Sequence, residues 1–313
     1  MARIGLIDVD GKGFPNIPLM KLSAWHKMKG DVVEWYDPMF SGHFDRVYLS
    51  KVFSFTSDYQ YPIDANVIIR GGTGYCISMQ DCKEKFDSCR NNNLPYQIEH
   101  IYPDYSIYPD LTKDTAFGFL TRGCPRGCDF CIVGEKEGQR SFKVADLNEF
   151  WHGQRKIVVC DPNILACNDW KDLLKQLIDS GSEIDFTQGL DIRLMTEEKA
   201  EILNNLKIKE IHFAWDRYED KNIILQKLEM FSSIFKINSN AHKSIVYTIV
   251  NFNTTIDQDL DRVYTLRDLG YWPYIMIYNK SNCNRIYKDL QRWVNNRIIF
   301  GKCKKFEDYK RNN

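Results

Sequence analysis

The sequence predicts an α/β protein whose strands are parallel, and two observations lead to that prediction. Short apolar runs alternate with segments in which apolar residues recur at helical spacing, first within residues 1–110 and again within residues 117–278. Most of the apolar runs end in a polar residue or a glycine turn. Because parallel neighbours need a crossover connection, usually a helix, this alternation favours parallel sheets with ligands at the carboxyl ends of the strands.

The first segment begins with an apolar strand over residues 4–7 that ends in Asp8. A helix is expected over residues 15–29, because its apolar residues share one face and Gly30 follows as a stop signal. Three further apolar runs are predicted strands: residues 32–36, 45–49 and 66–69. This order predicts a Rossmann-like domain over residues 1–92.

The second segment, residues 116–279, repeats the strand–helix unit, with strands expected over residues 117–120, 157–160, 184–186, 210–215, 244–250 and 274–278. Helix signals lie between them. Gly181 and Gly270 follow helical patterns as C-terminal stops, and Thr196 stands in the position of an N-cap. Thr255 and Gln258 have the spacing of a capping box.

Two segments flank this second domain. Residues 93–115 contain Pro95, Pro103 and Pro109 and are expected to be a linker. Residues 280–313 are a basic extension that is expected to be helical, and it can bind phosphate backbones or be the solvated face of a helix around Ile286, Leu290, Trp293 and Val294. Its basic residues are Lys280, Arg285, Lys288, Arg292, Arg297, Lys302, Lys304, Lys305, Lys310 and Arg311.

Composition is that of a soluble globular protein. The chain has 313 residues, of which 43% are hydrophobic and 27% charged, and its net charge is zero. No apolar run is long enough to span a membrane, and the N-terminus has no signal-peptide pattern, so a cytoplasmic location without membrane contact is expected. Ten cysteines in a chain of this length do not indicate a disulfide scaffold, and reducing surroundings suit a metal centre.

Three of these cysteines, Cys124, Cys128 and Cys131, follow an apolar strand at the spacing CxxxCxxC. Thiolates so spaced can hold one soft-metal centre, and iron–sulfur clusters are bound by cysteines on short loops. Three ligands leave one iron of a 4Fe–4S cluster open for substrate. The alternative is a zinc site that takes a fourth ligand from elsewhere in the chain.

This loop resembles the defining motif of the radical SAM superfamily, CxxxCxΦC, with Phe130 as the aromatic residue before the last cysteine. The resemblance implies a partial (β/α)6 TIM-like barrel over residues 116–279. It also implies a 4Fe–4S cluster on Cys124, Cys128 and Cys131 that cleaves S-adenosylmethionine reductively to a 5′-deoxyadenosyl radical, and a reductant such as a flavodoxin or ferredoxin. The substrate, a small molecule or RNA, and the reaction, methylation or another radical outcome, are left open.

The resemblance also implies cofactor-binding positions at the ends of barrel strands. Asp161 or Asn163 would accept a hydrogen bond from the methionine amino group, Arg193 would bind the methionine carboxylate, and Asp216 would bind the ribose. The alternative for each is an ordinary loop salt bridge. No catalytic residue is assigned, and His212, inside a predicted strand, is expected to be packed or hydrogen-bonded.

The N-terminal domain resembles the cobalamin-binding-like domain that precedes many radical SAM barrels. The strand-one acid, the helix over residues 15–29 and the glycine turn over residues 71–74 carry this likeness. Asp10 stands where some cobalamin enzymes have a cobalt-binding histidine, and a carboxylate is a poor substitute for imidazole on cobalt. Bound cobalamin and a scaffold that binds nothing therefore stay open as alternatives.

Three functions compete at this stage. The leading one is a radical SAM enzyme; the second is a radical SAM enzyme that modifies RNA held by the basic extension. The third is a non-catalytic interaction protein whose cysteines hold zinc. A second cluster on Cys76, Cys82 and Cys89 is conceivable, although their spacing matches no auxiliary-cluster pattern.

Overall fold

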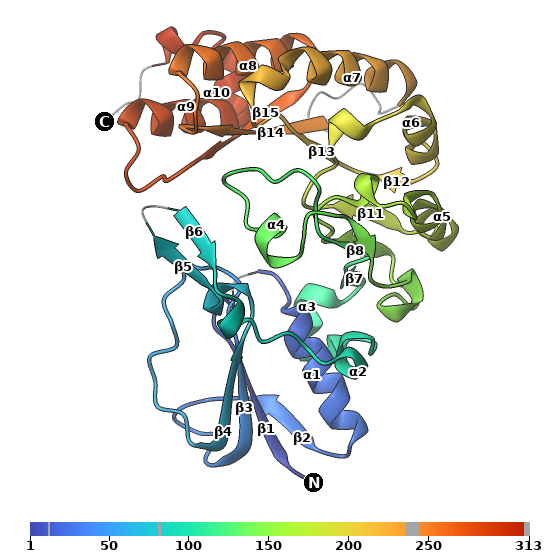
Figure 1. Ribbon diagram of the computed structural model, residues 1–313, viewed down its shortest axis with the longest axis vertical. Coiled ribbons are helices and arrows are strands. Elements are labelled where there is room, and N and C mark those ends of the chain that lie inside the picture. Colours follow the sequence, from blue (N-terminus) through green and yellow to red (C-terminus); the bar gives the residue numbers. More distant parts are fainter. Residues whose placement is uncertain (12, 81–82, 236–243, 310–313) are drawn as a thin grey trace. The chain divides into compact units, whose positions relative to one another are not determined.

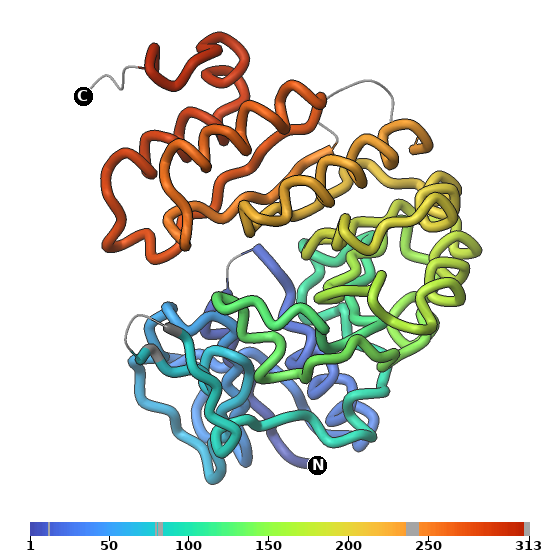
Figure 2. Tube along the Cα trace, turned by 45° about the horizontal axis from the view of Figure 1, so that its top comes forward, coloured from blue at the N-terminus to red at the C-terminus, as the bar shows by residue number. Residues whose placement is uncertain are grey.

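The computed structural model describes residues 1–11, 13–80, 83–235 and 244–309, and it has a mixed α/β fold with parallel sheets. The chain divides into two compact units, Met1–Cys160 and Asp161–Asn313, whose traces are shown in Figures 1 and 2. The expected domain limits at residues 92, 115 and 279 stay predictions. Among the described residues, none of the helices has the length and apolar character of a membrane-spanning segment.

The first unit begins with a four-stranded parallel sheet in the order β2-β1-β3-β4. The helix α1 (Ile17–Met28) connects the first two strands, and the Asn16 side chain caps its N-terminus by accepting from the backbone of Leu19 at 3.2 Å. Every strand and helix expected in this segment is present. The strands are β1 (Arg3–Asp8), β2 (Val32–Trp35), β3 (Phe44–Ser50) and β4 (Ala65–Gly71).

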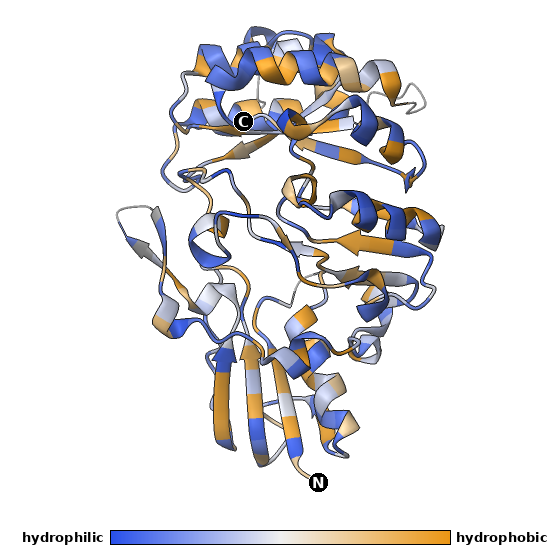
Figure 3. Ribbon diagram, turned by 45° about the vertical axis from the view of Figure 1, so that its right-hand side comes forward, coloured by the Kyte–Doolittle hydropathy of each residue, from blue (hydrophilic) through white to orange (hydrophobic). Residues whose placement is uncertain are grey.

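The two faces of this sheet are covered differently. One face packs Ile4 and Leu6 against Leu19 of α1 and Ile98 of α2 (Tyr96–Glu99). The opposite face, which includes Val47, is covered by aromatic and aliphatic residues of the connecting segments 36–43 and 51–64, which contain no helix. Strand–helix alternation therefore occurs once in this sheet, since prolines and glycines in these connections oppose helix formation. Figure 3 shows the hydrophobic residues along its strands.

The rest of the first unit leads to the cysteine loop. Strands β7 and β10 pair in parallel, with Thr115 opposite Lys156 and Gly118 opposite Val159. Short helices occupy the expected linker. The elements in order are η1 (Thr73–Tyr75), β5 (Ile77–Gln80), β6 (Lys83–Phe86), η2 (Ser88–Arg90), α2, η3 (Tyr105–Ile107), α3 (Pro109–Thr112), β7 (Thr115–Gly118), β8 (Thr121–Arg122), α4 (Val133–Lys136), β9 (Phe142–Lys143), η4 (Leu147–Glu149) and β10 (Lys156–Val159).

The second unit continues the strand–helix order. Its expected helix ends are confirmed: Gly181 is left-handed after α5, Thr196 accepts from the backbone of Lys199, and Thr255 and Gln258 form the capping box of α8. The elements are η5 (Ile164–Ala166), α5 (Trp170–Ser180), β11 (Glu183–Phe186), η6 (Ile192–Leu194), α6 (Glu197–Leu203), β12 (Lys207–Ile208), β13 (Ile211–Ala214), η7 (Tyr218–Asp220), α7 (Lys221–Ile234), β14 (Ser244–Val250), α8 (Ile256–Asp268), β15 (Trp272–Ile277), α9 (Arg285–Asn295), α10 (Arg297–Lys302) and η9 (Phe306–Asp308).

The sheet β13-β14-β15 is parallel and is the centre of this unit. Helices α7, α8 and α9 lie on one side of it (Figure 1), where Phe213 of β13 meets Phe231 of α7 with ring centroids 4.9 Å apart. Trp293 and Val294 of α9 are fully buried in a core cluster with Val263 of α8 and Ile275 of β15. The basic extension therefore packs as helices through its apolar residues, while Lys310 and Arg311 lie outside the described residues.

Candidate functional site

The cysteine loop is an excursion from a short hairpin. Strands β8 and β9 pair antiparallel, with Thr121 opposite Lys143, and so close the loop over residues 123–141. Inside it, the backbone N–H of Cys124 donates to the Gly138 carbonyl at 3.1 Å, and that of Cys131 donates to the Cys128 carbonyl at 2.9 Å. These bonds fix the backbone that carries the three thiols.

A glycine and an ion pair hold the start of this loop. Gly123 has φ of +77°, and a Cβ there would lie 2.1 Å from the Arg140 carbonyl, so only glycine fits. The Glu137 carboxylate accepts from the Gly123 N–H at 3.1 Å and from the Arg122 guanidinium at 2.9 Å. Arg122 in turn stacks on the ring of Phe119 at 3.4 Å. The cysteine loop is thereby tied to the segment that follows β7.

The three thiols share one loop and differ in exposure. Cys124 and Cys128 are half-buried, Cys131 is exposed and Phe130 is half-buried. Three accessible thiols on one turn-rich loop are the donor chemistry of an iron–sulfur cluster, so the residues fit this cofactor by type and spacing. Within the described ranges, however, no group of three or more His, Cys, Asp or Glu side chains converges on one metal position.

A polar cluster in the second unit joins two of the predicted cofactor positions, Asn163 and Arg193. The Asn163 amide donates to Asp191 at 3.3 Å, and Arg193 donates to Asp191 at 2.8 Å and to Asp220 at 2.7 Å. Burial alone would lower the pKa of Arg193, but hydrogen bonds and charges of the two carboxylates raise it. Arg193 thus has the loop salt bridges that were the alternative to carboxylate binding, and its cofactor role stays a prediction.

Asp216 lies just beyond β13, within the electrostatic influence of Arg193 and Asp191. Its Oδ1 accepts from the backbone N–H of Ile249 at 3.3 Å. Burial raises the pKa of Asp216 to about 6. Asp161 and Asn163 are both almost fully buried after β10. Asn163, Arg193 and Asp216 therefore belong to one polar region of the second unit, while the cysteines belong to the first.

An arginine of α8, which the sequence analysis did not single out, holds the backbone around Asp216. Arg262 is fully buried and donates to the carbonyls of Trp215, Asp216 and Ile249 at 2.7, 3.0 and 2.8 Å. It also pairs with Asp259, one turn earlier on the helix, at 2.5 Å. It thus fixes the end of β13 against the end of β14. The sequence gives no signal for this role, because residue spacing along a helix does not distinguish a buried arginine from an exposed one.

The N-terminal acids and glycines are engaged in internal contacts. Asp8 accepts from the Tyr108 hydroxyl at 2.6 Å, and Asp10 accepts from the backbone of Val52. A Cβ at Gly72 would lie 2.4 Å from the Lys51 carbonyl, so the glycine turn packs tightly against the segment after β3. With carboxylates and no imidazole at this position, the residues do not fit a cobalt ligand.

The cysteines considered for a second cluster differ in burial as far as the structure describes them. Cys76 is buried, and burial raises the pKa of its thiol, whereas Cys89 is exposed. Cys82 lies outside the described residues. A buried thiol of raised pKa is less readily ionised for metal binding. The second cluster stays a prediction without further support.

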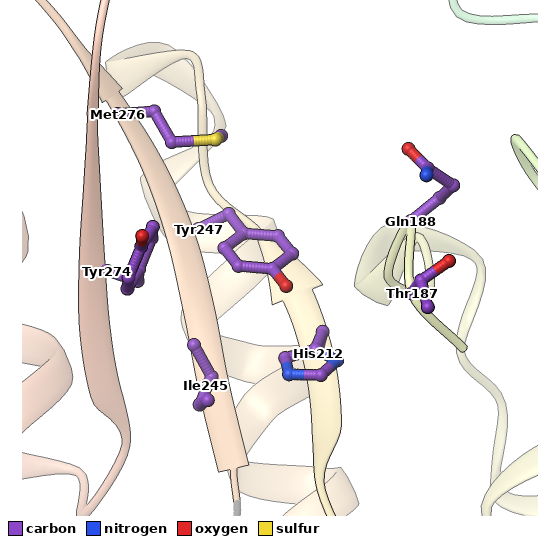
Figure 4. Close-up of a pocket in the computed structure, with 7 residues that line it drawn as sticks. All are labelled: Thr187, Gln188, His212, Ile245, Tyr247, Tyr274 and Met276. Carbon is purple, nitrogen blue, oxygen red and sulfur yellow. The ribbon is translucent and has the colours of Figure 1, made fainter. Parts of the chain in front are cut away.

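A pocket of about 550 Å³ lies in the second unit, against the sheet β13-β14-β15 (Figure 4). His212, expected to be packed or hydrogen-bonded, is buried in its wall, and its Nδ1 has no hydrogen-bond partner among the described residues. The aromatic residues of β14 and β15 that line this pocket were missed. Their signal was the alternation that puts Tyr247, Tyr274 and Met276 on one face. The lining residues are Thr187, Gln188, His212, Ile245, Tyr247, Tyr274 and Met276.

No protein-family model matches this chain, and no curated protein matches it significantly.

Proposed function

We propose that this chain is a radical SAM enzyme that holds a 4Fe–4S cluster on Cys124, Cys128 and Cys131. The observation that supports this best is the CxxxCxxC loop with Phe130 before its last cysteine, which the short strand β8 separates from β7, a strand of a parallel pair. Chemistry in α/β folds gathers at the carboxyl ends of parallel strands. The backbone of this loop is held by the close approach at Gly123, where only glycine fits, and by the backbone hydrogen bonds of Cys124 and Cys131.

When bound, a 4Fe–4S cluster would supply the one electron for reductive cleavage of S-adenosylmethionine, with methionine as the leaving group and the 5′-deoxyadenosyl radical available to abstract hydrogen from an unknown substrate. The chain's own residues bind the cluster and orient S-adenosylmethionine. Cys124, Cys128 and Cys131 bind iron as thiolates. Asp161 or Asn163 accepts from the methionine amino group, since both lie after β10 and are buried away from water.

Asp216 is proposed to bind the ribose. Its pKa of about 6, raised by burial, leaves it ionised at neutral pH, so that it accepts hydrogen bonds from hydroxyl groups. Arg193, already paired with Asp191 and Asp220, is proposed to orient this region, and it binds the methionine carboxylate only if one of these pairs opens. The proposal includes the partial (β/α)6 barrel, with the N-terminal sheet as a Rossmann-like domain and a flavodoxin or ferredoxin as reductant.

Anaerobic reconstitution with iron and sulfide, followed by metal analysis, tests the cluster. We expect about four iron and four sulfide per chain and a broad absorbance near about 400 nm. The Cys128→Ala variant should lose most of the iron. Cys283→Ala is the matched control, because Cys283 lies outside the loop and its thiol donates to the Lys280 carbonyl at 3.3 Å. One zinc per chain and no iron would instead establish the zinc-binding alternative.

A further inference from the structure

The pocket on the sheet β13-β14-β15 has two walls of different origin. One wall is the face of the sheet turned away from α7, α8 and α9, and the other is the turn after β11 that carries Thr187 and Gln188 (Figure 4). The backbone N–H of Leu190 donates to the His212 carbonyl at 2.7 Å, and a Cβ at Gly189 would lie 3.2 Å from the same carbonyl. The turn after β11 is therefore fixed against β13, and these two elements hold the two walls of the pocket in place.

The sheet wall is aromatic. Tyr247 and Tyr274 are opposite each other in the register of β14 and β15, with ring centroids 5.7 Å apart and planes at 76°. The His212 imidazole is parallel to the Tyr247 ring, 8° between planes and 5.2 Å between centroids. Tyr274 and Met276 stay 41% and 39% exposed, although both are large and hydrophobic. This wall therefore offers ring faces and a thioether for a flat ligand to pack on.

The polar side chains that line this pocket include an imidazole and an amide, those of His212 and Gln188. His212 is only 9% exposed, and its Nδ1 lacks a partner among the described residues. This nitrogen is itself shielded from solvent, so a ligand reaches it only when the imidazole turns toward the pocket. A buried polar group without a partner is costly, and a ligand that then satisfies the imidazole gains affinity. Gln188 is exposed and presents an amide that can both donate and accept. The lining contains no Asp, Glu, Lys or Arg, and burial, together with the charges of Asp185 and Glu210 nearby, raises the pKa of Tyr247 to about 12.

We propose that this pocket binds an uncharged, planar heteroaromatic ring with hydrogen-bonding atoms on its edge, the chemistry of a nucleobase. A charged ligand would find no counter-charge in the lining, and an aliphatic one would leave the imidazole unsatisfied. Stacking on aromatic side chains with edge recognition by polar side chains is how proteins bind unpaired bases. The volume of about 550 Å³ also accommodates an attached sugar.

This site is distinct from the position proposed for the ribose of S-adenosylmethionine. Asp216 lies beyond the end of β13 and does not line the pocket, whereas the lining residues of the sheet lie within their strands. The inference needs neither iron nor S-adenosylmethionine. Its failure therefore leaves the proposed function standing, and failure of the cluster leaves this inference standing.

Binding of uridine and cytidine to the full chain, without iron or S-adenosylmethionine, tests the proposal by calorimetry and saturation-transfer NMR. We expect a Kd of about 1 mM or tighter for at least one nucleoside and none for cyclohexanol, which is similar in size to the base but not planar. Tyr247→Leu should weaken binding at least about fivefold, whereas Tyr247→Phe keeps the ring and should stay within about twofold. Tyr287→Leu, at a half-buried tyrosine of α9, is the control for general damage.

Two further experiments test whether the ring belongs to a free nucleoside or to RNA, and whether the pocket is separate from the site proposed around Asp216. A single-stranded RNA of six uridines that binds more tightly than uridine, with the same loss in Tyr247→Leu, assigns the ring to a polymer; equal affinity assigns it to a free nucleoside. Asp216→Asn should leave binding unchanged. The proposal is wrong if neither nucleosides nor the RNA bind, if cyclohexanol binds as well, if Tyr247→Leu binds normally in a folded protein, or if Asp216→Asn loses binding as Tyr247→Leu does.

Discussion

Asp216 is a proposed site residue whose ionisation is changed by its surroundings. Burial raises its pKa to about 6, whereas the hydrogen bond from Ile249 and the charges of Arg262 and Arg193 partly offset that rise. The folded protein therefore holds this proton more tightly than the unfolded chain does. Between about pH 4 and pH 6 the unfolded chain loses the proton first, so this residue makes the free energy of unfolding fall as the pH rises.

Replacing Asp216 with asparagine should remove that pH dependence. Above about pH 6 the variant should be more stable than the unchanged protein, by on the order of 2 kcal/mol, because a buried negative charge is gone and the amide oxygen still accepts from Ile249. Below about pH 4 the difference should vanish. Urea unfolding of both proteins at several pH values measures it, and a stability difference that does not change with pH would contradict this assignment.

Residue-level prediction from sequence succeeded where the signal is local. Thr196, Thr255 and Gly181 were predicted as caps and stops because each acts on backbone groups within the next or previous turn. The pairing of Arg193 with Asp220 could not be predicted, since the partner is 27 residues away and only the folded chain brings it close. The unsatisfied Nδ1 of His212 has the same origin, because only tertiary contacts decide which donors meet acceptors.

At the scale of elements, the cysteine loop depends on a single close backbone approach. Gly123 has a positive φ and lies against the Arg140 carbonyl, so that the loop leaves the β8–β9 hairpin in one direction. Gly138 also has a positive φ, +100°, but nothing lies within 4 Å of a Cβ there. An alanine would therefore be strained at either position, but only at Gly123 would its Cβ also clash with the backbone.

Gly123→Ala should displace the loop and reduce iron binding after reconstitution to a small fraction of the normal content. Gly138→Ala carries the strain of a positive φ without the clash, and it should keep more of the iron than Gly123→Ala does. Thermal unfolding of both variants checks that the first is still folded. Normal iron content in a folded Gly123→Ala variant would show that this glycine does not position the thiols.

At the scale of the whole molecule, the order of strands and helices was predicted from the sequence. The segments that cover one face of the N-terminal sheet were not. All the strands expected from apolar runs are present, and the mixed α/β class with parallel sheets is confirmed. The connections over residues 36–43 and 51–64 cover one sheet face with side chains such as Tyr36, Tyr59 and Ile63 instead of helices. Apolar periodicity could not reveal this, because residues of an irregular segment can be buried without any repeat.

Release of 5′-deoxyadenosine from the reconstituted protein, given S-adenosylmethionine and a reductant in the absence of substrate, tests the central claim most directly. Mass detection should find the nucleoside with the unchanged protein and with Cys283→Ala, and none with Cys128→Ala, because two thiols do not retain the cluster in place. Unchanged release from Cys128→Ala, or no release from protein that carries its full iron and sulfide, would contradict the assignment of this loop as a radical SAM site.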